Sequence, residues 1–203
     1  MGTPVKVTAI VGTYCKGGVI DSAVDEILAA AKEEGAEATK VYLIDQHVEF
    51  CSNCRTCTQQ EGEKRGHCPK EDDMAGLLDE IERSDAIVLA SPMNFWSVTA
   101  VTKRFIERFV CYAYWPWGAG APEMRSKRKN KRAIIVASSA APALLARLHS
   151  RMVGLMKSAV DCLGARTIGV LFIGLAALEQ NQGLTDRTRR RARALGKRLA
   201  FHA

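Results

Sequence analysis

Four of the seven cysteines of this chain lie in one short polar segment, at a spacing suited to metal or redox chemistry. Two residues separate Cys51 from Cys54 and Cys54 from Cys57, and Cys68 follows after ten more. Three thiolates at such intervals can turn inward from one loop onto a common centre, and a later cysteine can supply the fourth ligand. A [4Fe-4S] cluster, structural zinc, a redox-active disulfide and thiols that bind nothing are the alternatives.

A second candidate site follows the first apolar run, residues 5–11. The next residues read Gly12-Thr13-Tyr14-Cys15-Lys16-Gly17-Gly18, and apolar residues at helical spacing begin at Ile20. Glycines let backbone N–H groups face an anion, and a hydroxyl, a lysine and a helix N-terminus add to a phosphate site. The loop has neither the Walker spacing nor the G-x-G-x-x-G spacing of dinucleotide sites, so it favours a mononucleotide.

Strands and helices are expected to alternate along the whole chain. The apolar patterns predict strands at 5–11, 41–44, 86–90, 133–137 and 167–173, and helices at 20–31, 74–81, 101–110, 144–163 and near the C-terminus. This alternation predicts an α/β fold with a doubly wound parallel sheet of five strands and helices on both faces. The flavodoxin-like strand order 2-1-3-4-5 places ligands at the carboxyl ends of strands one and three. The loop 92–98, with its aromatic pair Phe95 and Trp96, then suits a stacked ring.

Composition indicates a soluble protein with one core. The 203 residues are 47% hydrophobic, which predicts a single domain over 1–203 with a cysteine-rich loop at about 46–72 and a long loop at about 112–131. Neither a long apolar run nor a signal-peptide layout is present, so we expect a cytoplasmic protein without a membrane segment. The net charge of +7 comes from two basic patches, 125–132 and 185–203. We interpret the second as a solvated or oligomer-contacting helix face, in preference to a nucleic-acid surface.

Taken in order, these motifs resemble the NAD(P)H-dependent FMN reductase group of flavodoxin-like proteins, and more narrowly its iron-sulfur flavoproteins. The matching features are the loop 12–18, the four cysteines with Asp72-Asp73-Met74 beyond them, Ser91-Pro92 with its aromatic loop, and the helix that opens at Thr99. The resemblance implies FMN held by Thr13, Cys15, Lys16, Gly17, Gly18, Ile20, Ser22, Pro92, Met93, Asn94, Phe95, Trp96, Ser138 and Ser139. It implies a cluster held by Cys51, Cys54, Cys57 and Cys68.

The chain also departs from the family pattern at identifiable positions. Val19-Ile20 replaces the usual Asn-Thr, with Ser22 as a substitute hydroxyl, and Asn94 stands where many relatives have an aromatic residue. The last cysteine spacing is longer than in typical iron-sulfur flavoproteins.

The resemblance also implies an activity. The implied activity is that of an FMN-dependent oxidoreductase. Such an enzyme takes hydride from NADH or NADPH and reduces a small acceptor such as a quinone, flavin, metal ion or dioxygen. Because the flavin does the chemistry, no catalytic side chain is required. A homodimer or homotetramer is expected. An electron carrier for a protein partner and a zinc-binding nucleic-acid module are the alternative functions.

Overall fold

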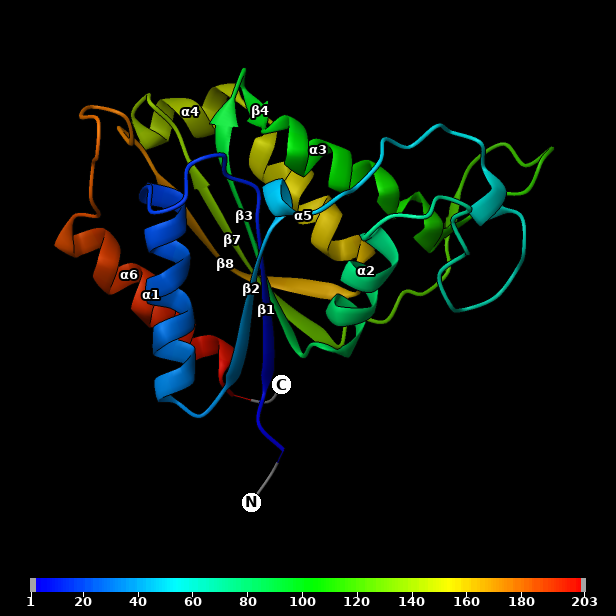
Figure 1. Cartoon of the computed structure of the whole chain (residues 1–203), viewed down its shortest axis with the longest axis horizontal. Helices are drawn as coiled ribbons and strands as arrows, with labels where there is room; N and C mark the ends of the chain where they lie inside the picture. Colours follow the sequence, from blue (N-terminus) through cyan, green and yellow to red (C-terminus); the bar gives the residue numbers. More distant parts are fainter. Residues whose placement is uncertain (1–2, 202–203) are drawn as a thin grey trace.

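A computed structural model describes residues 3–201 and shows three layers, with a central sheet covered by helices on both faces (Figure 1). The main sheet contains β1 (Lys6–Val11), β2 (Glu37–Tyr42), β3 (Ala86–Asn94), β4 (Ser97–Val98), β7 (Lys131–Ser138) and β8 (Ala165–Ile173). The helices are α1 (Val19–Glu33), α2 (Met74–Arg83), α3 (Ala100–Glu107), α4 (Ala143–His149), α5 (Met152–Cys162) and α6 (Asp186–Leu199). Shorter elements are the 3-10 turns η1 (Leu43–Asp45), η2 (Thr56–Thr58) and η3 (Arg108–Tyr112), and the paired strands β5 (Ala113–Tyr114) and β6 (Glu123–Met124).

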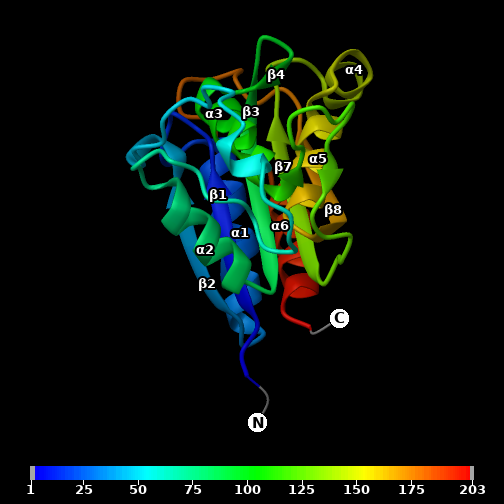
Figure 2. The same cartoon turned by 90° about the vertical axis from the view of Figure 1, so that its right-hand side faces the viewer.

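The five long strands are parallel and follow the order β2-β1-β3-β7-β8. Figure 2 shows β2 near one edge of this sheet and β8 near the other. The order is the predicted 2-1-3-4-5 arrangement, which confirms the fold class. β4 adds a short antiparallel pair at the end of β3.

The central strands form where the sequence is continuously apolar. In β1 every residue after Lys6 is buried, and β7 is buried from Arg132 to Ser138. This pattern is typical of parallel strands that are covered on both faces. One core layer lies under α1 and α6, and the other lies under α2, α3 and α5.

The basic C-terminal helix packs directly on α1. A Cβ at Gly196 would lie 2.1 Å from the carbonyl oxygen of Ile27, so this close approach requires glycine. Four ion pairs join the two helices, and they are Arg189–Glu26, Arg193–Glu26, Arg193–Glu33 and Lys197–Glu34. Part of the positive charge predicted to be solvated therefore faces the acidic side of α1.

Several element boundaries differ from the sequence prediction, and three of the differences have a clear physical reason. β2 begins at Glu37, four residues before the predicted start, because this edge strand is only partly buried and carries a polar pattern. β3 continues through Pro92 to Asn94, where a loop was expected, because residues 86–92 pair with β7. The predicted helix 144–163 is two helices, since Ser150 adopts an extended conformation between α4 and α5.

None of the helices within residues 3–201 combines the length and the apolar character that a membrane span requires.

Candidate functional site

Buried hydroxyl groups join the carboxyl ends of β1 and β3, where the strand order reverses. Thr99 caps α3 by accepting the N–H of Thr102, and its Oγ1 donates to the carbonyl of Gly12 at 2.6 Å. Ser91 Oγ accepts from the backbone N–H of Thr99 at 3.1 Å and from Thr102 Oγ1 at 3.2 Å. These bonds hold the loop after β1 against the end of β3, which fixes the geometry of the switch point.

The loop after β1 presents backbone N–H groups at the start of α1. Gly17 has a φ of +79°, a conformation that favours glycine. Gly18 is the N-cap residue in an extended conformation, and it offers no side-chain acceptor to the first turn. The buried Thr13 accepts the N–H of Cys15 through its Oγ1 at 3.2 Å. An uncapped helix N-terminus beside a hydroxyl is a suitable anion site.

A buried carboxylate, Asp21, braces this loop. It accepts the N–H of Gly17 at 2.6 Å, the Tyr42 hydroxyl at 2.8 Å and the Lys40 ammonium at 2.9 Å. Burial alone raises the pKa of Asp21, but these three donors hold it below its usual value. Lys16 was predicted to contribute positive charge to a phosphate site. In the structure its ammonium group forms a surface ion pair with Asp45 at 2.6 Å. Asp21 is a structural residue of the loop that sequence reasoning did not identify.

Replacing Asp21 by asparagine is expected to lower the free energy of unfolding by about 2 kcal/mol at neutral pH, because a buried charged acceptor loses its strongest bonds. The native pKa is depressed, so the wild-type advantage is complete above about pH 5 and declines as the pH falls below about 4. Urea unfolding of both proteins from pH 7 to pH 3 measures this difference. Asp25→Asn, at an exposed carboxylate that also contacts Lys40, is the control and should change little. If the difference in the free energy of unfolding between wild type and Asp21→Asn grew toward low pH, Asp21 would not stabilise the loop as a carboxylate.

A cavity of about 420 Å³ opens at the switch point between this loop, β3 and β7. It is lined by Thr13, Tyr14, Cys15, Lys16, Gly17, Gly18, Val19, Ile20, Pro92 and Ser138, together with Ala176, Ala177, Glu179, Gln180, Asn181 and Gln182. The structure thus brings eight of the predicted flavin-site residues together. The wall from the loop after β8 was missed, because a polar loop carries no motif that would mark it.

The other predicted flavin-site residues do not line this cavity. Ser22 lies on α1 and donates to the carbonyl of Gly17 at 3.3 Å, and Ser139 donates to the carbonyl of Ala141 at 2.7 Å. Met93 and Asn94 belong to the end of β3. Phe95 and Trp96 form the tip of the β3–β4 hairpin, where both have positive φ angles and exposed side chains. In the single chain this aromatic pair faces solvent.

All four predicted metal ligands line a second cavity of about 240 Å³. Its wall contains Cys51, Ser52, Asn53, Cys54, Arg55, Cys57, Cys68, Lys70, Arg108, Val110 and Trp115. One zinc ion would hold four thiolates about 3.8 Å apart, given a Zn–S bond of about 2.3 Å in a tetrahedron. Within residues 3–201 no three His, Cys, Asp or Glu side chains are gathered closely enough for a single ion. In a [4Fe-4S] cluster each thiolate binds a different iron, so four thiols around one cavity are the residues that would hold it.

The surroundings of the cysteines shift the pKa values of Cys57 and Cys54 in opposite directions. Burial raises the pKa of Cys57, and the neighbouring Cys68, Cys51 and Cys54 raise it further, so a thiolate there requires a compensating positive centre. The Thr56 hydroxyl, which lies 3.4 Å from the Cys54 sulfur, lowers the pKa of that thiol. Without a compensating positive centre, this environment favours the neutral thiol at Cys57.

Two arginines fasten the long loop after η3 onto the cysteine loop. The Arg55 guanidinium stacks on Trp115 at 3.8 Å and on Trp117 at 4.2 Å, and it donates to the carbonyl of Trp115. Arg125 donates to the carbonyl of Cys57 at 3.0 Å and to that of Cys111 at 3.1 Å. Trp115 also borders the cysteine cavity.

The two cavities lie apart. They share no lining residue, and Figure 1 shows the cysteine loop, in cyan, across the molecule from the blue loop after β1. In the single chain the cysteine loop therefore does not border the switch-point cavity. The reason is that the chain runs past α3 after η1, so the cysteines pack against η3.

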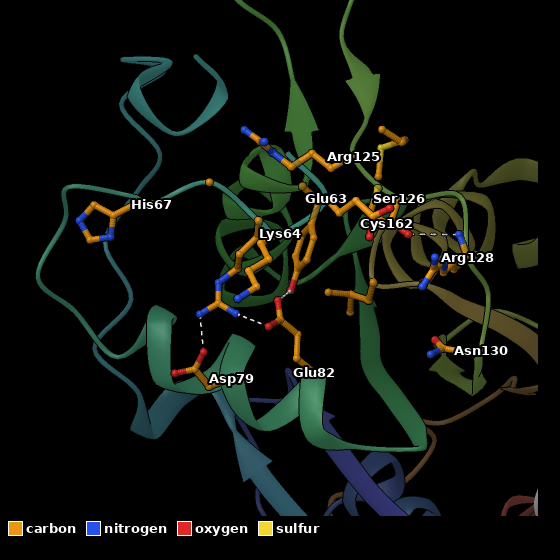
Figure 3. A pocket seen from close by; sticks show the side chains of 16 residues that line it. Glu63, Lys64, His67, Asp79, Glu82, Arg125, Ser126, Arg128, Asn130 and Cys162 are labelled. Atoms are coloured by element: carbon orange, nitrogen blue, oxygen red, sulfur yellow. Dashed lines mark hydrogen bonds and ion pairs between the residues drawn. The ribbon is translucent and has the colours of Figure 1, made fainter. Parts of the chain in front are cut away.

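A third, polar cavity of about 610 Å³ lies below the cysteine loop and is held by internal ion pairs (Figure 3). Arg65 bridges Asp79 at 2.5 Å and Glu82 at 2.7 Å, and the Tyr112 hydroxyl donates to Glu82 at 2.8 Å. His67 borders this cavity, whereas the four cysteines line the other. Through these ion pairs, Arg65 ties the segment that leads to Cys68 onto α2.

The parallel sheet with a mononucleotide-sized cavity at its switch point defines a flavodoxin-like α/β protein. The model of the family described as NADPH-dependent FMN reductase matches residues 5–172. The chain therefore belongs to the NADPH-dependent FMN reductase family.

Similar proteins agree with this assignment. An iron-sulfur flavoprotein of Archaeoglobus fulgidus is 34% identical over 111 residues, which are 55% of this chain and 48% of the relative. The chain spans about half the length of the curated relatives it matches.

Two solved structures establish the fold. An FMN-dependent NADH-azoreductase from Bacillus anthracis in complex with FMN has a TM-score of 0.70 at 12% identity, covering 97% of this chain and 100% of that chain. An NAD(P)H:quinone oxidoreductase from Methanothermobacter marburgensis has a TM-score of 0.66 at 15% identity, covering 98% of each chain.

Proposed function

We propose that this protein is an FMN-dependent oxidoreductase that takes hydride from NAD(P)H and passes electrons to a small acceptor. The observation that carries the proposal is the cavity at the switch point, where the loop after β1, Pro92 and Ser138 meet in a member of this family. Quinones, free flavins, metal ions and dioxygen are the acceptor classes. When bound, FMN supplies a ring that accepts a hydride and releases electrons singly or in pairs.

Different residues of the cavity are suited to bind different parts of FMN. The Thr13 hydroxyl and the N–H groups of Val19 and Ile20 are suited to the phosphate at the positive end of α1. Pro92 and Ser138, at the paired ends of β3 and β7, are suited to the ring edge. The polar loop 176–182 forms the opposite wall. No side chain needs to act as a general acid or base, since the protein's task is to orient the ring.

We further propose that the four cysteines hold a [4Fe-4S] cluster. Their position around one shared cavity supports a common centre for all four thiols. The curated relatives are named iron-sulfur flavoproteins, which supports the same reading. Such a centre would give electrons a second place to reside in the protein.

We also propose that the protein works as a homodimer or homotetramer. The α4 patch consists of Leu144 and Leu148, each 71% exposed, with the exposed Leu145 and with Trp96, whose ring lies 6.5 Å from that of His149. An exposed apolar patch of this kind is typical of a protein–protein interface. It would also cover Trp96 at the tip of the hairpin that was predicted to contact the ring.

Leu148→Glu is expected to weaken self-association at least about tenfold, because each symmetric contact would bury an unpaired carboxylate. Sedimentation velocity should then show a monomer at concentrations where the wild type is an oligomer. Phe50→Glu, at a similarly exposed residue on the cysteine side of the chain, is the matched control and should leave the oligomer intact. An unchanged sedimentation coefficient for Leu148→Glu would exclude the α4 patch as the interface.

Anaerobic purification followed by a visible spectrum and by iron, sulfide and zinc analysis tests both cofactor proposals. The expected protein shows flavin bands and contains about four iron and four sulfide ions per chain. A colourless protein that contains zinc would refute both.

A further inference from the structure

A buried guanidinium forms part of the wall of the cysteine cavity. Arg108 opens η3 and is 4% exposed. Its Nη1 donates to Asp72 Oδ2 at 2.5 Å and to the carbonyl of Glu49 at 2.9 Å. Its Nη2 reaches Asp72 Oδ1 and the sulfur of Cys68, both at 3.3 Å. One side chain thus contacts a carboxylate, a backbone carbonyl and a candidate ligand sulfur.

Asp72 determines the orientation of this guanidinium. The carboxylate is buried and also accepts the backbone N–H groups of Glu49 at 2.8 Å and Met74 at 3.1 Å. With both oxygens fixed, the planar guanidinium has one orientation in which both of its terminal nitrogens are bonded. In that orientation an N–H of Nη2 is directed at Cys68.

The other candidate ligands have different neighbours. Cys54 faces the Thr56 hydroxyl, and Cys51 Sγ lies 3.8 Å from Asn53 Oδ1. Lys70 also borders the cavity, but it is paired with Glu49 at 2.5 Å and is partly exposed. Among the described residues, Arg108 is therefore the cation that contacts a cysteine sulfur of this cavity.

We propose that Arg108 is a positioning residue that raises the reduction potential of the centre held by the four cysteines, by donating a hydrogen bond to Cys68 Sγ. The inference rests on the proposed cluster. An N–H donor withdraws electron density from a ligand thiolate and stabilises the reduced, more negative form. Reduction adds one electron from an external reductant, and no bond forms or breaks. Because Asp72 cancels the charge of Arg108, the effect arises from the directed hydrogen bond.

The test is a dithionite titration of the full chain, purified anaerobically with its cofactors and followed by electron paramagnetic resonance of the reduced centre. The double variant Arg108→Met/Asp72→Asn removes the donor without changing the net charge or leaving an unpaired buried ion. Its midpoint potential is expected to be lower than that of the wild type. Lys70→Met/Glu49→Gln removes the other ion pair beside the same cavity and should cause a clearly smaller shift. Arg108→Lys keeps the charge, loses the planar fork and should also lower the potential if the double variant does not fold.

The outcomes separate the tuning role from the cluster itself. Wild-type protein without iron or sulfide would overturn the cluster and with it this inference. Wild-type protein with a cluster, combined with an Arg108 variant whose potential equals that of the wild type or of the Lys70 control, would overturn the tuning role alone.

Discussion

Cys57→Ser is expected to yield a folded flavoprotein that has lost its iron and sulfide. Cys57 is the most buried of the four candidate ligands, and its thiol carries a raised pKa beside the other three cysteines. Serine keeps the volume but is a poor iron ligand, so bound iron should fall at least about tenfold. Bound FMN should remain, because the flavin cavity shares no residue with the cysteine cavity. Iron, sulfide and flavin content of the anaerobically purified variant give the result.

The matched control is Cys162→Ser, which changes a cysteine on α5 that lies outside the cysteine cavity. This variant should retain iron at the wild-type level. Equal iron content in both variants would show that Cys57 is not a ligand. Loss of flavin together with iron in Cys57→Ser would show that the two sites depend on each other.

Gly18→Asp is expected to weaken FMN binding strongly without destabilising the protein. Gly18 has an extended backbone, and a Cβ there would meet its nearest atom, the carbonyl oxygen of Cys15, at 3.3 Å, so a side chain fits with a small adjustment. Aspartate is a good N-cap residue and favours the helix dipole. Its carboxylate would occupy the anion position, and repulsion of about 3 kcal/mol from the phosphate should reduce FMN affinity at least about 100-fold.

Two comparisons make this prediction specific to the phosphate. Gly18→Asn has nearly the same shape without the charge and should lower FMN affinity much less. Riboflavin has no phosphate, so its affinity should differ little between the two variants. Fluorescence titration of flavin-free protein measures all of these constants, and an aspartate variant that binds FMN as tightly as the asparagine variant would place the phosphate elsewhere.

The parts of the structure that could be predicted from the sequence are those with a strong local signal. The buried runs of β1, β3 and β7 predicted the central strands, and the loop after β1 was recognised from its glycines. The spacing of the four cysteines predicted that they share one site, and they line one cavity.

The remaining features depend on contacts between distant segments. Arg108 reaches Cys68 across 40 residues, and Arg55 stacks on Trp115 across 60 residues, so neither contact leaves a local pattern. The apolar spacing of α4 resembled a core helix, yet Leu144 and Leu148 point to solvent. An exposed apolar stripe and a buried one look alike in sequence, so the exposure of α4 could not be predicted.

The proposed activity depends on FMN in the switch-point cavity accepting hydride from a nicotinamide cofactor. Anaerobic mixing of the FMN-loaded protein with NADH, and separately with NADPH, tests this with the visible flavin bands as the readout. We expect at least one of the two donors to bleach these bands at a rate that depends on its concentration. Retention of the oxidised flavin spectrum with both donors, in protein that dithionite does bleach, would show that the chain is not an NAD(P)H-dependent reductase.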